Sequence, residues 1–355
     1  MEELLVDRRG RLGVLTLNRP KSINAITLNM VRLVQAQLHE WRDDDSVAQI
    51  AILGAGERGL CAGGDIIELR RGMLDGDGSE AARFLFEEYR LYADINEYPK
   101  PVISFQDGIV LGGGVGISGH ASHRIVTERS RVGFPECTIG FIPDVGGTWL
   151  LGHARPGLGT RLALSSEQAG PADAIAIGMS DHFVPSDRLE ELLAALEHED
   201  ADAAIPRFVA EAGPTPLVDA AVEWADDSYA ATSVDGILER LDDAGHAVAS
   251  ALAERMRSKS PEALAVTLEA LRRTRELRSL RDALRLEYLA GTARFDRPDF
   301  AEGVRAQVVD KDRSPTWSPA TLAEVDPAVV AAHFEPGRHG ELRFEDEEDA
   351  KEHRP

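Results

Sequence analysis

Short apolar runs alternate with polar segments in the first half of the chain, whereas hydrophobic residues mostly follow helical spacing in the second half. Residues 4–6 and 12–17 are apolar and flank Asp-Arg-Arg-Gly-Arg, which predicts a β-hairpin. Between residues 27 and 41 the apolar side chains share one helical stripe, and Thr27 suits the N-cap of that helix. Further apolar runs predict buried strands at 47–53, 102–105 and 124–127.

A second amphipathic helix is expected from residue 79 to residue 97, and its apolar face carries an acid. Glu88 lies in the middle of that face, whereas the adjacent Glu87 falls off it. A carboxylate at a core-facing position is costly unless it has a partner or a task. Two interpretations follow: Glu88 is a buried structural acid with satisfied hydrogen bonds, or it is a functional acid.

Three consecutive glycines at 112–114 precede an apolar segment. They suggest a loop with unhindered amides at the N-terminus of a helix, an arrangement that stabilises negative charge. The residues 114–119 also match the dinucleotide-binding pattern G-x-G-x-x-G. The next strand-like run begins at residue 124, however, which leaves too few residues for a β-α-β crossover. The spacing therefore argues against a dinucleotide site.

The stretch from residue 133 to residue 148 reads Gly-Phe-Pro-Glu-Cys-Thr-Ile-Gly-Phe-Ile-Pro-Asp-Val-Gly-Gly-Thr. Its prolines and glycines indicate a defined backbone, and its two acids, Glu136 and Asp144, lie among apolar side chains. Such surroundings destabilise an ionised carboxylate, which suits a proton shuttle or a nucleophile. The alternative is that both acids cap helices on a surface loop.

Beyond residue 160 the chain is rich in Ala, Leu, Glu and Arg and is predicted to be mainly helical. Helix starts are expected at residues 186–187 and at Ser260-Pro261-Glu262. We therefore expect an α/β body at 1–190, a helical region packing on it at 191–335, and a charged, flexible tail at 336–355.

The composition narrows the class of protein. A net charge of −22 over 355 residues disfavours a nucleic acid or an anionic membrane as a partner. The two cysteines are too few for a disulfide framework, the first residues lack a signal-peptide pattern, and no segment approaches the ~20 apolar residues of a membrane span. A soluble, cytoplasmic protein is expected.

A series of motifs extends over nearly the whole chain. They are Asn18-Arg-Pro-Lys-x-x-Asn-Ala25, Leu60-Cys-Ala-Gly-Gly-Asp65, Glu87-Glu-Tyr89, Gly112-Gly-Gly-Val-Gly116, Phe134-Pro-Glu136, Phe141-Ile-Pro-Asp-Val-Gly-Gly147, Lys259-Ser-Pro261, Asp299-Phe-Ala-Glu-Gly-Val-Arg305 and Asp310-Lys-Asp-Arg-Ser-Pro-Thr-Trp-Ser-Pro319. In this order they resemble the enoyl-CoA hydratase/isomerase (crotonase) superfamily, and within it the 3-hydroxyisobutyryl-CoA hydrolases most. The resemblance implies an α/β fold, a crotonase-like spiral of β-β-α units with a helical C-terminal region.

The resemblance also implies roles for individual residues. The superfamily stabilises an acyl-thioester oxyanion with two backbone amides, which by motif position belong to Gly64 and Gly113. Glu88 corresponds to a substrate-contacting acid of the hydrolases. The residues expected to line the CoA channel are Lys21, Ile23, Ala25, Ala62, Asp65 and Ile66.

Two departures from the hydratases indicate the reaction. Hydratases use two glutamates; the first corresponds here to Gly116, which has no side chain, and the second remains as Glu136. Asp144 stands where hydratases commonly carry glycine. The pair resembles the hydrolase arrangement, in which Glu136 attacks the thioester carbonyl or activates a water. Asp144 then orients the substrate hydroxyl or the water and helps to protonate the departing CoA. The implied reaction converts 3-hydroxyisobutyryl-CoA to 3-hydroxyisobutyrate plus CoA in valine degradation.

Two other functions are compatible with this sequence: an enoyl-CoA hydratase or isomerase, and a non-catalytic acyl-CoA-binding protein. No cofactor is expected, since coenzyme A is part of the substrate. No metal is expected either, because His120 and His123 lack further ligands at suitable spacing. The preferred acyl group is undetermined by the sequence, and a homo-oligomer remains an option.

Overall fold

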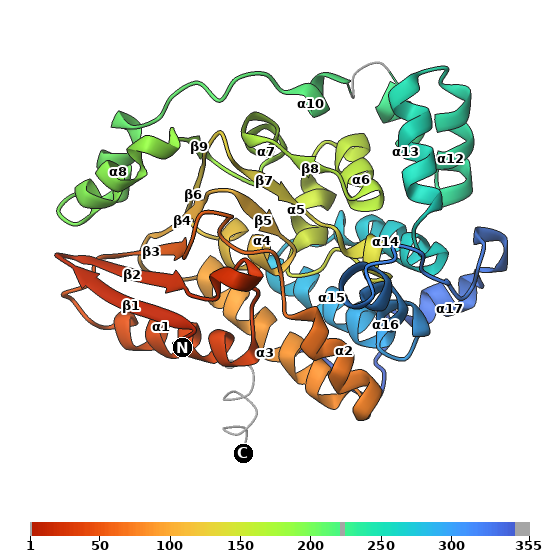
Figure 1. The fold of residues 1–355 in the computed structure, drawn as a ribbon, viewed down its shortest axis with the longest axis horizontal. Helices are drawn as coiled ribbons and strands as arrows, with labels where there is room; N and C mark the ends of the chain where they lie inside the picture. Colours follow the sequence, from red (N-terminus) through yellow and green to blue (C-terminus); the bar gives the residue numbers. More distant parts are fainter. Residues whose placement is uncertain (1, 221–223, 345–355) are drawn as a thin grey trace.

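Two β-sheets form the first part of the computed structural model, which describes residues 2–220 and 224–344. The larger sheet has the strand order β1-β2-β3-β4-β6-β9 (Figure 1). Its strands are β1 (Leu4–Arg9), β2 (Leu12–Leu17), β3 (Gln49–Gly54), β4 (Val102–Gln106), β6 (His123–Val126) and β9 (His182–Phe183). The smaller sheet consists of β5 (Ile109–Leu111), β7 (Arg131–Gly133) and β8 (Gln168–Ala169). β1 is antiparallel to β2, and the other neighbours in the larger sheet are parallel.

From β4 to β7, consecutive strands alternate between the two sheets, and each pair then leads into a helix. β4 and β5 are followed by α4 (Gly113–Gly119), and β6 and β7 are followed by the 3₁₀ turn η2 (Glu136–Ile139) and α5 (Gly147–His153). This order is the predicted repetition of β-β-α units. Because β5 and β7 pair in parallel, the loops that follow them lie next to each other at one edge of the smaller sheet.

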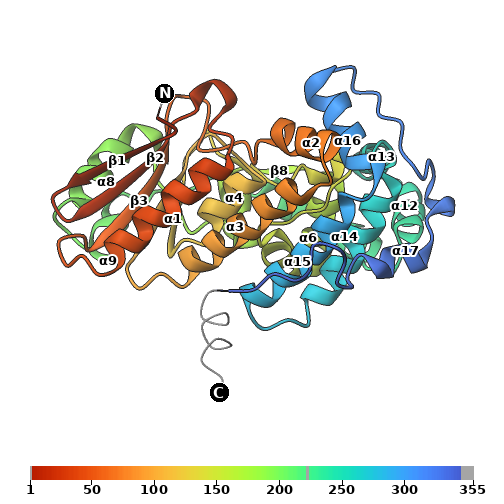
Figure 2. The same ribbon diagram turned by 90° about the horizontal axis from the view of Figure 1, so that it is seen from below.

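Helices cover both faces of the larger sheet (Figure 2). α1 (Leu28–Arg42) and α3 (Ser79–Asn96) lie on one face, and α8 (Leu189–Leu196) and α9 (Ala201–Ala204) lie on the other. Side chains of β2 alternate accordingly: Leu15 joins the core with α1 and α3, and Val14 joins the core with α8. Parallel strands buried on both faces require such a double cover.

The C-terminal helices lie at the end of the molecule opposite the β1–β2 hairpin (Figures 1 and 2). They are α12 (Val234–Asp243), α13 (Ala247–Arg257), α14 (Pro261–Thr274), α15 (Leu280–Arg294), α16 (Pro298–Val304) and α17 (Pro327–Ala332). The shorter helices α2 (Ile66–Asp75), α6 (Pro156–Ser165) and α7 (Pro171–Ile177) lie within the α/β body, and α10 (Pro216–Ala220) and α11 (Asp226–Tyr229) precede α12 along the chain. α15 packs on α3 and α14 packs on α5, so one apolar core joins the helical region to the α/β body.

The longer predicted elements are confirmed. The hairpin is present, and Thr27 caps α1 by accepting a hydrogen bond from Met30 N (3.1 Å). Ser260 caps α14 in the same way, accepting from Ala263 N (3.1 Å). The sequence pattern did not predict β5, β8 or β9, because strands of two or three residues are too short to show alternation.

The predicted flexible tail lies only partly within the described residues, since residues 345–355 fall outside them. Leu342 and Phe344 are 2% and 3% exposed, and the guanidinium groups of Arg281 and Arg285 lie over the Phe344 ring. The prediction is therefore wrong for residues 342 and 344. Their charged neighbours concealed two apolar side chains that pack on the helical region.

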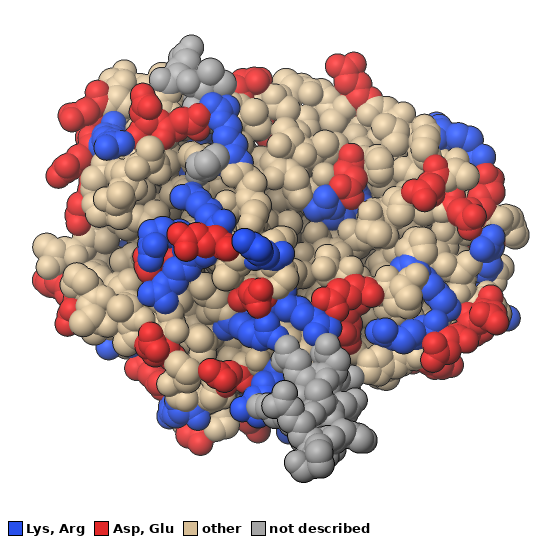
Figure 3. All heavy atoms as spheres, turned by 180° about the vertical axis from the view of Figure 1, so that it is seen from behind, with Lys and Arg blue, Asp and Glu red and all other residues tan. Residues whose placement is uncertain are grey.

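Acidic and basic side chains are interspersed over the face drawn in Figure 3. None of the helices in the described ranges 2–220 and 224–344 has the length and apolar character needed to cross a membrane.

Candidate active site

Two glycine loops meet where β5 ends. Cys61 forms a bridge with Val110 of β5, so the chain from residue 61 to residue 64 runs beside that strand. A Cβ atom built on Gly113 would lie 3.1 Å from Gly64 N, which shows how closely the two loops approach. Within the described part of the chain, neither the Gly64 nor the Gly113 amide donates a hydrogen bond. Two adjacent free amides suit an oxygen that gains negative charge.

Glu136 opens η2, and its carboxyl packs against the second glycine loop. A Cβ atom on Gly112 would lie 2.4 Å from Glu136 Oε1, so this position, which has φ +51°, accommodates only glycine. Glu136 is 6% exposed, and its Oε2 has no hydrogen-bond partner among the residues that the structure describes. Burial, and next the nearby Asp144 carboxylate, raise the pKa of Glu136 well above its usual range.

Asp144 lies in a tight turn that leads into α5. The two residues after it, Val145 and Gly146, have φ values of +58° and +79°. A left-handed conformation at a β-branched residue such as Val145 costs on the order of 1–3 kcal/mol and is found chiefly at functional sites. Tyr89 Oη donates a hydrogen bond to Asp144 Oδ2 (2.6 Å). Burial raises the pKa of Asp144 to about 7, while the Tyr89 hydrogen bond opposes this rise.

Glu88 is buried, as its place on the apolar face of α3 predicted, and is 2% exposed. Its Oε1 accepts a hydrogen bond from Tyr92 Oη (2.6 Å) and lies 3.1 Å from the Cβ position of Gly113. Burial, and next the charge of Asp144, raise the pKa of Glu88 well above its usual range. The hydrogen bond from Tyr92 agrees with a satisfied structural acid, but Glu88 also lines the cavity beside the glycine loop, which favours the functional interpretation.

Tyr92 also fills the space next to Gly116. A Cβ atom on Gly116 would lie 2.4 Å from Cε2 of the Tyr92 ring, which is far inside van der Waals contact. The Tyr92 hydroxyl reaches both Glu88 and the carbonyl oxygen of Gly113 (3.2 Å). The absence of a side chain at Gly116 therefore allows the tyrosine to hold Glu88.

A cavity of about 280 Å³ brings these groups together. The predicted site residues that line it are Ala62, Gly64, Ile66, Glu88, Gly113, Glu136 and Asp144. Most of the remaining wall is apolar, with Phe84 and Leu85 from α3 and with Phe295 and Phe300 from the C-terminal region. Apolar walls with a few convergent polar groups are typical of a small-molecule site.

Four predicted binding residues lie outside the lining of this cavity: Lys21, Ile23, Ala25 and Asp65. Lys21 is exposed on the short turn η1 (Pro20–Ser22), and Asp65 caps α2 and pairs with Arg19 (2.9 Å). The carbonyl of Ile23 accepts a hydrogen bond from Ala62 N (2.9 Å), so this segment supports the first glycine loop. Contact of these four residues with CoA stays a prediction.

The sequence patterns did not identify several groups at the site. Tyr89 belongs to a motif but was assigned no role, and Tyr92 is four residues from Glu88, a spacing that brings side chains together on a helix. Phe300 likewise lies in a motif but was assigned no role, and Phe295 carried no signal, because phenylalanines in a helical region are expected in any core.

The two histidines considered as metal ligands make other contacts, and the cysteine next to Glu136 is a buried thiol. The described residues contain no cluster of His, Cys, Asp and Glu side chains suited to a metal ion. His120 Nε2 is hydrogen-bonded to the Val145 carbonyl (2.8 Å), and His123 Nε2 pairs with Asp202 (3.1 Å). Burial raises the pKa of the Cys137 thiol to about 11, which makes it a poor nucleophile.

Comparison with known sequences places these observations in a family context. The family model described as enoyl-CoA hydratase/isomerase matches residues 12–334. The mitochondrial 3-hydroxyisobutyryl-CoA hydrolase of Danio rerio is 36% identical over 342 residues, which covers 94% of this chain and 89% of the relative. The human protein of the same name is 35% identical over 356 residues, covering 97% of this chain and 91% of the relative.

Solved structures match the fold over the same extent. A carnitinyl-CoA dehydratase from Mycobacterium thermoresistibile is 45% identical, with a TM-score of 0.93 and coverage of 97% of this chain and 99% of the other. An enoyl-CoA hydratase from Rhodobacter sphaeroides 2.4.1 is 39% identical, with a TM-score of 0.90 and coverage of 97% and 100%.

Proposed function

The chain belongs to the enoyl-CoA hydratase/isomerase family, and we propose that it hydrolyses the thioester of 3-hydroxyisobutyryl-CoA to 3-hydroxyisobutyrate and free CoA. The relatives named as 3-hydroxyisobutyryl-CoA hydrolases support this substrate class. The observation that carries the proposal is the contact of the Glu136 carboxyl with the glycine loop.

That contact determines which atom of the substrate Glu136 faces. An oxyanion bound by the Gly64 and Gly113 amides fixes the thioester carbonyl carbon beside the same loop. Glu136 Oε1 packs against Gly112, so its carboxyl lies within reach of a carbonyl carbon held at that loop. An oxygen base at this place attacks the carbonyl carbon or delivers a water to it.

Hydrolysis forms a C–O bond and breaks the C–S bond. Glu136 either adds to the carbonyl carbon, giving an anhydride that water then cleaves, or removes a proton from the attacking water. Asp144 holds a proton near neutral pH because burial raises its pKa, and this proton passes to the sulfur of CoA. The two neighbouring carboxyls titrate as a pair, so one ionised and one protonated acid coexist at intermediate pH.

Glu88 is assigned to the 3-hydroxyl of the acyl group. Tyr92 donates to one of its oxygens, and the carboxyl keeps further acceptor capacity toward the cavity. A hydroxyl bound there orients the acyl chain away from the thioester carbon, which exposes that carbon to Glu136.

Hydration or dehydration of a similar thioester is the second candidate, favoured by the likeness to solved structures described as a dehydratase and a hydratase. The hydratases that this chain resembles use an acid at the position of Gly116. Here the Tyr92 ring occupies that space, and Asp144 supplies the second acid elsewhere. We therefore favour hydrolysis.

Other aspects of the function follow only from the proposed substrate. We propose a role in valine degradation, and the cytoplasmic location and a homo-oligomeric state stay predictions. The curated relatives are named as mitochondrial.

The decisive assay measures free thiol released from 3-hydroxyisobutyryl-CoA, with hydration of crotonyl-CoA followed in parallel. The proposal predicts thiol release without hydration. Hydration without thiol release would establish the second candidate instead. Binding of the thioester without turnover in either assay would indicate a non-catalytic acyl-CoA-binding protein.

A further inference from the structure

Two polar side chains of α15 contact the turns that carry the two acids. Glu287 and Arg294 are separated by two helical turns and therefore project from the same side of the helix. Both are 0% exposed, and neither is among the residues that line the cavity. Their effect on the acids is therefore exerted through the backbone.

Glu287 holds residues 144–148, which we call the Asp144 turn. Its Oε2 accepts a hydrogen bond from Gly146 N (2.7 Å), and its Oε1 accepts from Thr148 N (2.8 Å) and Thr148 Oγ1 (2.5 Å). These are among the first amides of α5, which have no partner inside the helix. The left-handed conformations of Val145 and Gly146 explain why the turn needs such support.

Arg294 holds residues 136–140, which we call the Glu136 turn. Its Nε and Nη2 donate to the carbonyl oxygen of Gly140 at 3.0 and 2.9 Å. Gly140 ends η2 with φ +69°, and a Cβ atom there would lie 2.5 Å from the carbonyl oxygen of Asp299. The end of the Glu136 turn is thus fixed between α15 and α16.

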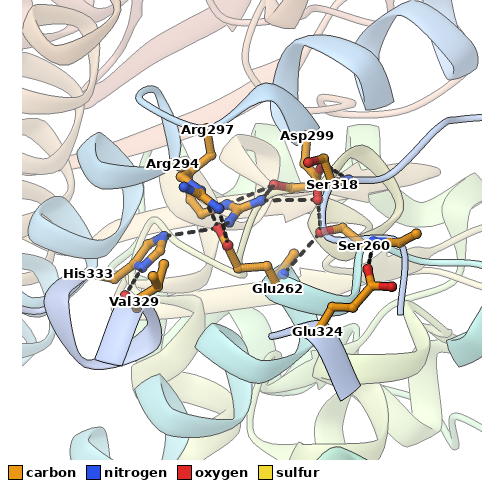
Figure 4. A network of polar contacts seen from close by, with 12 residues as sticks. Ser260, Glu262, Arg294, Arg297, Asp299, Ser318, Glu324, Val329 and His333 are labelled. Carbon is orange, nitrogen blue, oxygen red and sulfur yellow. Dashed lines mark hydrogen bonds and ion pairs between the residues drawn. The ribbon is translucent and has the colours of Figure 1, made fainter. Parts of the chain in front are cut away.

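A buried ion-pair network fixes Arg294 itself (Figure 4). Its Nη1 donates to Glu262, and its Nη2 lies 3.7 Å from Asp299 Oδ2. Arg297 pairs with the same Glu262 (2.7 Å) and, within the described residues, donates no hydrogen bond to the Glu136 turn, so it provides a comparison for Arg294. Buried ion pairs contribute little net stability, whereas their geometry restricts the orientation of each member.

We infer that Glu287 and Arg294 are positioning residues that set the orientation of Asp144 and Glu136 relative to each other. The inference rests on the proposed function, because it assigns these two acids to the reaction. Each contact has the polarity that its turn requires: the Glu287 carboxylate accepts from amides, and the Arg294 guanidinium donates to a carbonyl. Through these two side chains, which do not line the cavity, the C-terminal region controls turnover in addition to supplying Phe295 and Phe300 to the apolar wall.

The test compares two variants with matched controls. Glu287→Gln keeps the shape of the side chain, but only the amide oxygen can then accept a hydrogen bond, since the amide nitrogen is a donor. Arg294→Lys removes the two N–H groups that both donate to the Gly140 carbonyl oxygen. Asp173→Asn controls for the first variant, since Asp173 is 2% exposed and accepts from the amides of Leu217 and Val218 (both 3.1 Å). Arg297→Lys controls for the second. Thiol release gives kcat and KM, and hydrogen–deuterium exchange of peptides covering 136–148 reports on the turns.

Displacing a reacting group by a fraction of an ångström lowers the rate, so both α15 variants are expected to reduce kcat at least about tenfold with KM within about threefold. Hydrogen–deuterium exchange of the backbone amides in the Asp144 turn is expected to be faster in the Glu287→Gln variant than in the wild type. The two controls keep kcat within about twofold of the wild type, because loss of a remote contact affects stability rather than the reacting groups.

The pH profile adds a readout that loss of stability alone does not move. The titratable groups around the acid pair are Glu88, Tyr89 and Tyr92 of α3, Glu287 of α15, and Lys259 before α14. Burial raises the pKa of Glu287 to about 8, so Glu287→Gln, which changes only one of these groups, removes a negative charge only above that pH. A shift of the rising limb of kcat/KM below that pH therefore reports a changed orientation of the two acids rather than a lost charge.

The inference is overturned if Glu287→Gln keeps kcat within about twofold of the wild type, whether or not exchange changes. An unshifted rising limb in this variant overturns it as well. If Arg294→Lys does not fold, Glu287→Gln decides alone. Failure of the proposed function is distinguishable, since it appears as a wild-type protein that releases no thiol.

Discussion

Different side chains contact the acids Asp144 and Glu88 of the α/β body and the acid Glu262 of the C-terminal helical region. In the body, Asp144 and Glu88 accept hydrogen bonds from Tyr89 and Tyr92, which are neutral donors. In the helical region, Glu262 pairs with arginines, as Figure 4 shows. A tyrosine leaves a buried carboxyl able to hold a proton, whereas an arginine fixes its negative charge. The comparison indicates that proton transfer belongs to the body and that geometric support belongs to the helical region.

The same division applies to the backbone. The body offers free amides at Gly64 and Gly113, where chain turns leave N–H groups unpaired. The helical region offers α15, whose side chains satisfy the backbone groups of neighbouring turns. Substitutions of the acids and the glycine loops in the body should therefore change kcat, and substitutions in the helical region away from α15 and from the cavity wall should change stability.

The largest effect among these tests is expected for Asp144→Asn. The amide keeps the size of the side chain but has no proton to give to the CoA sulfur, so kcat for thiol release falls by about 10²–10³-fold. KM stays within a few-fold, because the apolar wall is unchanged. A kcat near that of the wild type would show that Asp144 takes no part in the reaction and would contradict the assignment of proton transfer to the α/β body.

The pH dependence should follow the raised pKa values of the body. The acid pair must lose one proton before Glu136 can act, so kcat/KM rises with pH through an apparent pKa above the ordinary carboxyl range, because burial raises the pKa of both acids. The rate constant at pH 5 is therefore well below its plateau. A rising limb of kcat/KM with an apparent pKa near the ordinary carboxyl value would show that the acids are not buried as described.

Stability should show the opposite dependence on pH. The ordinary pKa of Asp144 is 3.8, and burial raises it to about 7 in the folded protein. Between these values the folded state binds more protons than the unfolded state, so this group lowers the free energy of unfolding as pH rises. Urea unfolding at several pH values, compared between wild type and Asp144→Asn, isolates that contribution.

A smaller effect is expected for Tyr89→Phe. Loss of the hydroxyl removes the hydrogen bond that opposes the raised pKa of Asp144, so the acid pair loses its first proton at higher pH. The rising limb therefore moves to higher pH, and kcat/KM at neutral pH falls about tenfold. Tyr98→Phe is the matched control, because its buried hydroxyl donates to the carbonyl of Leu38 (2.6 Å). Equal pH profiles for both variants would assign Tyr89 a packing role only.

The smallest effect on activity is expected for Ser233→Ala in the helical region. Ser233 caps α12 by accepting a hydrogen bond from Gly236 N (3.1 Å). Its loss lowers the free energy of unfolding by about 1 kcal/mol and leaves kcat within about twofold. Urea unfolding and thiol release measure the two quantities, and a tenfold loss of kcat would contradict the division between the regions.

The sequence predicted the body better than the helical region, for a physical reason. Gly64, Gly113, Glu136 and Asp144 lie in short motifs whose turns depend on nearby glycines and prolines. Glu88 was detectable because an acid on an apolar helix face contradicts the local pattern.

The contacts of α15 could not be predicted in this way. Glu287 lies 141 residues from Gly146, and Arg294 lies 154 residues from Gly140. Charged residues on a helix resemble an ordinary solvated face, and only the folded chain brings them to the turns. The burial of Phe344 could not be predicted from local sequence either, because the arginines that lie over its ring, Arg281 and Arg285, are distant in the chain.

The most direct measurement is single-turnover thiol release by Glu136→Gln, with binding of 3-hydroxyisobutyryl-CoA measured on the same protein. This substitution retains the shape of the side chain and removes the group that faces the thioester carbonyl. The account predicts binding within a few-fold of the wild type and thiol release slower by at least about 10³-fold. Thiol release at the wild-type rate would contradict the assignment of Glu136 to the reaction.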